Sequence, residues 1–182
     1  MKSLLKIGGA VTFPDFRKER AYMIPFKKGE KLQEPYSRWQ DTVDSMLEGV
    51  EVYGVIYMTI DQGEVRQGES QRRGGAHIDG IYTDIGWDTG PSWVTKDCAG
   101  GGIILASSHI GSKAYVGELA DDIGEGGDCS HMDLTSAEVH TLKPNLAYAG
   151  NISMVHETVP AAETHDRTFV RLTLPECYAF VA

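Results

Sequence analysis

The chain has few cysteines and few long apolar runs. Its three cysteines, Cys98, Cys129 and Cys177, are odd in number, lie far apart and include no CxxC pair. This usage favours a reducing compartment over a disulfide-stapled secreted domain. No apolar run is long enough for a transmembrane helix, and Lys6 interrupts the N-terminal apolar run before it could act as a signal sequence. We therefore expect a cytoplasmic protein that is not embedded in a membrane.

Positive charge is also scarce. The formal net charge of −9 would repel a phosphate backbone unless a local basic patch overcame it. The densest basic groups are short, namely Arg17–Arg20, Lys27–Lys28 and Arg72–Arg73. Nucleic acid is therefore a disfavoured partner. The sequence does not indicate an oligomeric state.

Short apolar runs and many turn residues dominate what is present. At 182 residues the chain is long enough for one sizeable core and short for two domains, and its 21 glycines favour β-structure. One amphipathic helix is expected between Pro35 and Gly49, packed on the outside of a sheet. Strands are expected at 50–60, 103–106, 146–148, 152–156, 167–174 and 177–181, with loops at 61–73 and 117–140. We predict one mainly β domain over 1–182, a sandwich or jelly roll (double-stranded β-helix) with one or two flanking helices. Its core covers about 50–182, and residues 1–49 support it.

The glycine-flanked stretch at 74–80 holds the most informative polar residues. Residues two apart on an extended strand point to the same face, so His77 and Asp79 can present an imidazole and a carboxylate to one ion. His156 follows far downstream, after enough chain for the strands that a jelly roll interposes between antiparallel neighbours. Two histidines and one carboxylate form the donor set of non-haem iron oxygenases.

A second His-x-Asp sequence, His131–Asp133, lies in the hydrophilic and glycine-rich segment 117–140. No strand is expected there to fix both side chains on one face, and the short distance to His156 leaves room for a hairpin at most. We interpret His131 and Asp133 as surface residues. The remaining histidines, His109, His140 and His165, are interpreted as ordinary surface or core residues.

Two arginines follow His156 on an expected core strand. Alternation along residues 167–173 places Arg167 and Arg171 on one face, together with Phe169 and Thr173. Two inward arginines are hard to explain in a plain core. A guanidinium fork is suited to pair the carboxylate of an enclosed ligand.

These residues resemble the His-x-Asp … His … Arg pattern of the 2-oxoglutarate and Fe(II)-dependent dioxygenases, whose fold is a double-stranded β-helix. The resemblance extends from about Val50 to the C-terminus. Within it, His156–Pro160 looks like the run around the distal metal ligand in the prolyl-hydroxylase branch.

The resemblance implies specific roles and cofactors. His77, Asp79 and His156 would hold Fe(II), and Arg167 would bind the distal carboxylate of 2-oxoglutarate. Arg171 competes with Arg167 for that role, and Tyr57 is a candidate for an assisting side chain. The implied cosubstrates are 2-oxoglutarate and O2, with ascorbate as a possible further reductant.

The implied reaction is oxidative decarboxylation of 2-oxoglutarate to succinate and CO2, coupled to hydroxylation of a substrate. Likeness to the prolyl-hydroxylase branch favours a protein or peptide side chain, and Arg73, Tyr82 and Trp87 are candidates for the substrate rim. Three alternatives stay open: the same chemistry on a small metabolite or nucleobase, a non-oxidative cupin-like protein with zinc or manganese, and a metal-free binding module. The cupin-like alternative gives Arg167 and Arg171 no role.

Overall fold

The structure is a computed structural model that describes residues 1–79, 82–83, 86–87 and 101–174. The strand expected at 177–181 lies outside these residues. For Tyr82–Thr83 (β5) and Gly86–Trp87 (β6) only the backbone pairing of the two short strands is described.

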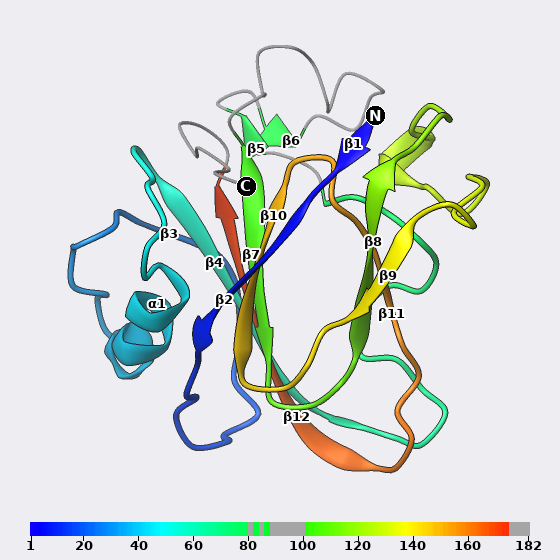
Figure 1. Cartoon of the computed structure of the whole chain (residues 1–182). Coiled ribbons are helices and arrows are strands. Elements are labelled where there is room, and N and C mark those ends of the chain that lie inside the picture. The colour runs from blue at the N-terminus through cyan, green and yellow to red at the C-terminus, as the bar shows by residue number, and fades with distance from the viewer. Residues whose placement is uncertain (80–81, 84–85, 88–100, 175–182) are drawn as a thin grey trace.

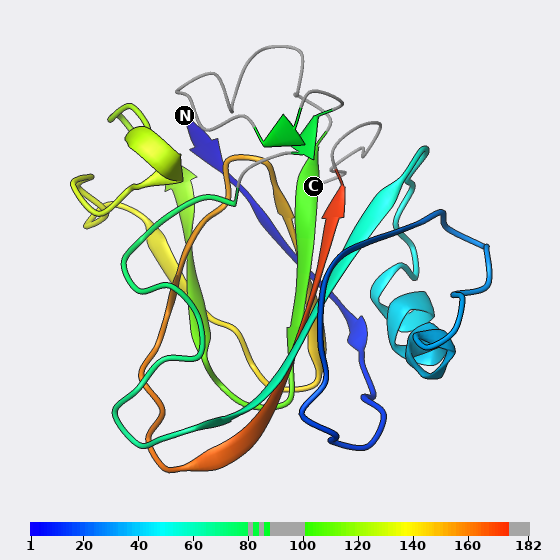
Figure 2. The same cartoon turned by 180° about the vertical axis from the view of Figure 1, so that it is seen from behind.

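Two antiparallel sheets face one another and make the fold mainly β, as predicted (Figures 1 and 2). The larger sheet contains, in spatial order, β2 (Leu5–Ala10), β10 (Leu146–Asn151), β7 (Gly102–Ser107), β12 (His165–Leu174), β4 (Ile56–Val65) and β3 (Arg20–Phe26). The smaller sheet contains β1 (Lys2–Ser3), β8 (Ser112–Glu118) and β11 (Val155–Thr158), with β9 (Glu138–Thr141) also paired to β8. Two facing antiparallel sheets are the arrangement of a β-sandwich.

The N-terminal segment ties the two sheets together. Strand β1 pairs with β8 in the smaller sheet, and β2, only one residue later, pairs with β10 in the larger sheet. Figure 1 shows this ribbon crossing from one sheet to the other. The N-terminal residues are therefore part of both sheets.

The predicted helix is present as a short 3-10 turn, Ser37–Trp39, followed by α1, Gln40–Met46. Trp39, Val43 and Met46 are buried in a cluster with residues of the larger sheet. The helix covers the outer face of that sheet, as expected (Figure 1). Among the described residues, no helix combines the length and the apolar character needed to cross a bilayer.

The strand expected at 50–60 is shifted along the chain. Strand β4 begins only at Ile56, because Tyr53 is exposed and Gly54 has a φ of +87°, a value that strands do not use. It then continues to Val65, so the first five residues of the loop expected at 61–73 belong to the strand.

Buried polar partners explain this difference. Asp61 forms ion pairs with Arg20 and Arg72, at 3.2 and 3.6 Å. Gln62 accepts hydrogen bonds from the backbone N–H of Arg17 and donates one to the hydroxyl of Thr168. Because distant residues satisfy these side chains, β4 can run through a polar sequence.

Candidate metal centre

His77 and His156 face each other across a backbone bridge between two segments. The N–H of His77 donates to the carbonyl of His156 at 2.9 Å, and the N–H of His156 donates to the carbonyl of His77, also at 2.9 Å. His77 lies in this isolated bridge and not in a regular strand, in contrast to the expectation. Directly opposed residues of an antiparallel pair place their side chains on the same face, and the two imidazole rings are 4.5 Å apart.

The third side chain, that of Asp79, comes from two residues after His77 and lies close to both imidazoles. One ligand atom each from His77, Asp79 and His156 can be chosen so that all lie within 4.8 Å of one another. The structure therefore brings together the three residues that the sequence analysis singled out. Atoms this close can be ligands of a single metal ion.

Backbone carbonyls fix the orientation of both imidazoles. Nδ1 of His77 lies 2.7 Å from the carbonyl oxygen of Gly75, and Nδ1 of His156 lies 3.2 Å from that of Met154. A carbonyl only accepts, so each neutral ring carries its proton on Nδ1 and presents the lone pair of Nε2. Such outer hydrogen bonds are the usual support of metal-binding histidines.

Arg171 of β12 holds the carboxylate of Asp79. Its Nη1 lies 2.8 Å from Oδ1 of Asp79, while Oδ2 faces Nε2 of His156 at 3.6 Å. Burial alone would raise the pKa of Asp79, but Arg171 and then the two histidines outweigh it and hold the pKa well below its usual range. One oxygen of a permanently charged carboxylate thus points toward the histidines.

The electrostatics of His77 also favour metal binding. Burial, followed by the neighbouring His156, lowers the pKa of His77 from 6.5 to about 4. The ring is therefore neutral near pH 7. A neutral imidazole is the form that can be a ligand.

The three side chains open onto a cavity of about 250 Å³. Apolar walls come from Leu105 and Phe169. Arg73, predicted for the substrate rim, is among the lining residues, as are Arg72 and Tyr22. The sequence analysis missed Tyr22, and it noted Arg72 only as part of a short basic group.

Arg167 lies next to this cavity, behind Phe169. It is 2% exposed, its Nε donates to the hydroxyl of Ser107 at 2.7 Å, and its Nη2 has no hydrogen-bond partner. A cavity of about 10 Å³ lies against Arg167 and shares the wall residue Phe169 with the larger one. Burial, and then Arg72, lower the pKa of Arg167 to about 10 although Asp61 opposes the shift. Its guanidinium is charged at neutral pH and retains an unused donor.

The other predicted site residues lie elsewhere or outside the described part. Tyr57 pairs with Thr173 on β12 and is not among the described residues that line the cavity. The backbones of Tyr82 and Trp87 pair with each other, and nothing further is described of their side chains. The roles proposed for these three residues stay predictions.

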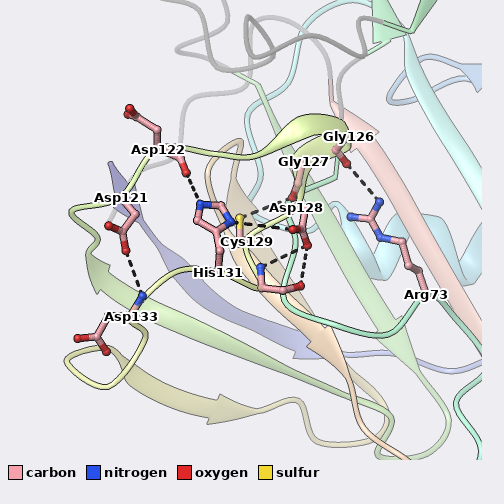
Figure 3. Close-up of polar contacts among 10 residues, drawn as sticks. Arg73, Asp121, Asp122, Gly126, Gly127, Asp128, Cys129, His131 and Asp133 are labelled. Atoms are coloured by element: carbon pink, nitrogen blue, oxygen red, sulfur yellow. Dashed lines mark hydrogen bonds and ion pairs between the residues drawn. The ribbon is translucent and has the colours of Figure 1, made fainter.

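The second His-x-Asp sequence forms no comparable cluster. Nε2 of His131 contacts the carbonyl of Asp122 at 2.9 Å, whereas the carboxylate of Asp133 accepts hydrogen bonds from Thr135. Figure 3 shows the imidazole of His131 directed at the carbonyl of Asp122, and the carboxylate of Asp133 pointing away from that imidazole. Both residues are exposed, as predicted.

The backbone of this same segment supports the metal centre. The N–H of Cys129 donates to the carbonyl of Ala76, and the N–H of Ile78 donates to the carbonyl of Gly127. These bonds flank His77 on the side opposite His156. Pairing on both sides keeps the imidazole of His77 in place.

No protein-family model matches this chain, and no curated protein sequence matches it.

Proposed function

We propose that the protein is a 2-oxoglutarate- and Fe(II)-dependent dioxygenase. The observation that carries this proposal is the convergence of His77, Asp79 and His156 on one point, with both histidines oriented through Nδ1. Two imidazoles and one carboxylate fit Fe(II), and these three side chains would hold the ion. With O2, bound iron and 2-oxoglutarate would supply the oxidising chemistry that yields succinate, CO2 and a hydroxylated substrate.

The order of the strands supports the jelly roll that the resemblance implies. One sheet contains the row β4–β12–β7–β10, and in the other the His77 segment lies beside β11, then β8, then β9. Along the chain, β4 of the larger sheet is followed by the His77 segment of the smaller one, then by β7 (larger), β8 and β9 (smaller), β10 (larger), β11 (smaller) and β12 (larger). Seven strands and the His77 segment, divided in this way between two sheets, fit a double-stranded β-helix.

Arg167 is the candidate for binding the distal carboxylate of 2-oxoglutarate. A buried guanidinium with a free donor is the partner that an enclosed carboxylate requires. Arg171 already binds a carboxylate, that of Asp79, which gives it the task of orienting a metal ligand. Arg171 stays the alternative, because its Nε also has no hydrogen-bond partner.

The peptide substrate has weaker support than the cofactors. It rests on the likeness of His156–Pro160 to a prolyl-hydroxylase run. In that run Glu157 bonds to Lys113 and Tyr115 of β8, at 2.6 Å each, and the hydroxyl of Thr158 donates to the carbonyl of Arg73. These contacts explain Glu157 and Thr158 as structural residues, without a peptide substrate. The arginines that line the cavity favour a small-molecule substrate.

The experiment is an anaerobic titration of the apoprotein with Fe(II) and then 2-oxoglutarate, followed by visible absorption. A 2-oxo acid chelated to iron gives a charge-transfer band, which we expect for the parent protein. Arg167→Gln should require about thirtyfold more 2-oxoglutarate or more, because it removes one partner of a buried charge pair. Its affinity for Fe(II) should stay unchanged. Arg167→Lys, which keeps the charge, is the control for folding.

Three outcomes have distinct meanings. If Arg171→Gln, and not Arg167→Gln, weakens 2-oxoglutarate, the roles of the two arginines are exchanged and the dioxygenase stands. If no band forms while zinc or manganese binds tightly, the cupin-like alternative replaces the proposal. If no divalent metal binds at all, the metal-free alternative does.

A further inference from the structure

The described residues that line the cavity beside the candidate metal centre carry more positive than negative charge. They include three arginines, Arg72, Arg73 and Arg171, and one carboxylate, that of Asp79. Asp79 is already paired with Arg171. Positive charge therefore remains at Arg72 and Arg73, in a protein whose formal net charge is −9.

Among the described residues, Arg72 shares its ion-pair partner with another arginine. Its Nη1 lies 3.6 Å from Oδ2 of Asp61, and Arg20 competes for the same carboxylate at 3.2 Å. The guanidinium of Arg72 also lies over the ring of Phe169, 5.5 Å from the centroid. Stacking on an aromatic wall fixes the plane of a guanidinium and leaves its N–H edge available.

Arg73 has a fixed backbone and an uncharged partner. The hydroxyl of Thr158, two residues beyond His156, donates to its carbonyl at 3.0 Å. Its Nη1 donates to the carbonyl of Gly126 at 3.2 Å, as Figure 3 shows. Among the described residues, Arg73 forms no ion pair within 4.0 Å, and Asp128 acts on it only at longer range. The charge of Arg73 is thus placed beside the metal centre without a carboxylate to neutralise it.

We propose that Arg72 and Arg73 bind an oxyanion group, a carboxylate, phosphate or sulfonate, of a small substrate that lies in this cavity. That the bound molecule is a substrate rests on the proposed function, whereas the binding of an oxyanion does not. Both guanidinium groups line the same cavity, and a guanidinium binds planar or tetrahedral oxyanions through paired charge-assisted hydrogen bonds. The cavity of about 250 Å³ fits a small molecule. The acidic surface disfavours a polyanion such as nucleic acid.

The test uses metal-free protein and methylphosphonate as the probe, with dimethyl sulfone as the uncharged counterpart. Binding is followed by calorimetry and by the side-chain Nε–H resonances of ¹⁵N-labelled arginines. Methylphosphonate should bind and shift the signals of Arg72 and Arg73, and dimethyl sulfone should not. Arg73→Gln should weaken binding about tenfold, since one charge-assisted interaction is lost. Arg73→Lys, which keeps the charge but not the fork, should weaken it less.

The matched control is Arg66→Gln. The Arg66 side chain is 72% exposed and pairs with Glu64 outside the cavity, so this variant also removes one arginine charge but should bind the probe as the parent does. If it weakens binding as much as Arg73→Gln, the effect is one of net charge and the proposal fails. Arg73 is itself exposed, so the folding of its variants is not at issue.

Competition with 2-oxoglutarate separates this proposal from the proposed function. Methylphosphonate should still bind when 2-oxoglutarate and Zn(II) are saturating. If 2-oxoglutarate displaces it, Arg72 and Arg73 serve the cosubstrate, and the inference is wrong while the dioxygenase stands. If the probe binds as expected but iron and 2-oxoglutarate give no band, the anion site stands and the dioxygenase does not.

Discussion

His77–Asp79 and His131–Asp133 have the same spacing of imidazole and carboxylate, but they lie in opposite environments. The side chain of Asp79 is 17% exposed and that of His131 is 50% exposed. His77 is paired on both sides by backbone hydrogen bonds, and a third ligand lies opposite it. Near His131 and Asp133 the side chains bind to their own loop. A His-x-Asp pair becomes part of a candidate metal centre when neighbouring segments fix its face and supply the missing donor.

The two segments also cooperate. Residues 127–129, which precede the exposed pair, form the outer neighbour of the His77 segment. The acidic loop therefore contributes its backbone to the metal centre, while its histidine and carboxylates stay outside. The predictions below test this division between the two segments.

The largest difference is expected in catalysis. His77→Ala should lower iron-dependent formation of succinate at least about a hundredfold, because loss of a ligand exceeds the effect of losing an outer hydrogen bond. Succinate is measured by NMR under saturating 2-oxoglutarate and Fe(II). His131→Ala is the matched control and should keep the parental rate. Equal loss in both variants would remove the distinction between the two motifs.

The next effect concerns the stability of the apoprotein toward acid. The pKa of His77 is about 4 in the folded chain, against its ordinary value of 6.5, so the unfolded chain binds more protons between these values. Stability should be complete above pH 6.5 and fall as the pH decreases toward 4, by on the order of 3 kcal/mol. Urea unfolding at several pH values measures this loss. In His77→Gln the loss should be smaller by about that amount, and an unchanged pH profile would contradict the assignment.

A smaller effect is expected from the two glycines that precede His77. Gly75 has a φ of +79°, its carbonyl accepts from Nδ1 of His77, and a Cβ there would lie 2.9 Å from the hydroxyl of Ser130. Gly75→Ala should therefore lower metal affinity about tenfold, as loss of an outer hydrogen bond does. Gly74→Ala, where a Cβ meets no atom within 4 Å, is the control. Calorimetry with Mn(II) compares the two, and equal affinities would show that the carbonyl of Gly75 is not needed.

The smallest effect is expected on the acidic loop. Asp133→Asn should change the free energy of unfolding by no more than about 0.5 kcal/mol, since the carboxylate is exposed and bonds only within its loop. Denaturant unfolding measures it. A loss of several kcal/mol would mean that this side chain, and not only the backbone at 127–129, supports the His77 segment.

Local sequence patterns predicted a good part of the fold. Helical periodicity gave the helix that ends at Met46, and the apolar run at 103–106 gave β7, because the helix buries one stripe and the strand is buried at consecutive positions. The strand expected at 167–174 lies within β12. The predicted end of β4 was wrong, since Asp61 and Gln62 are satisfied by residues far away in the chain. No local pattern contains that information.

The pair of candidate metal ligands His77 and Asp79 was predictable from local spacing, whereas the residues around it depend on long-range pairing. Side chains that are two positions apart on an extended segment lie on the same face, and this applies to His77 and Asp79 wherever the segment lies. Tyr22 was missed because the register of β3 shifts between Ala21 and Ile24, so alternation along the sequence does not show which face it takes. The pairing of Asp79 with Arg171 likewise depends on how the two sheets meet.

The most direct test of the metal centre is an anaerobic titration of the apoprotein with Co(II), followed by visible absorption, in the parent, Asp79→Asn and Asp133→Asn. We expect one equivalent of Co(II) to bind tightly to the parent and to Asp133→Asn, and the affinity to fall at least about a hundredfold in Asp79→Asn. Undiminished binding in Asp79→Asn, or loss of binding in Asp133→Asn, would show that the metal centre is not formed by His77, Asp79 and His156.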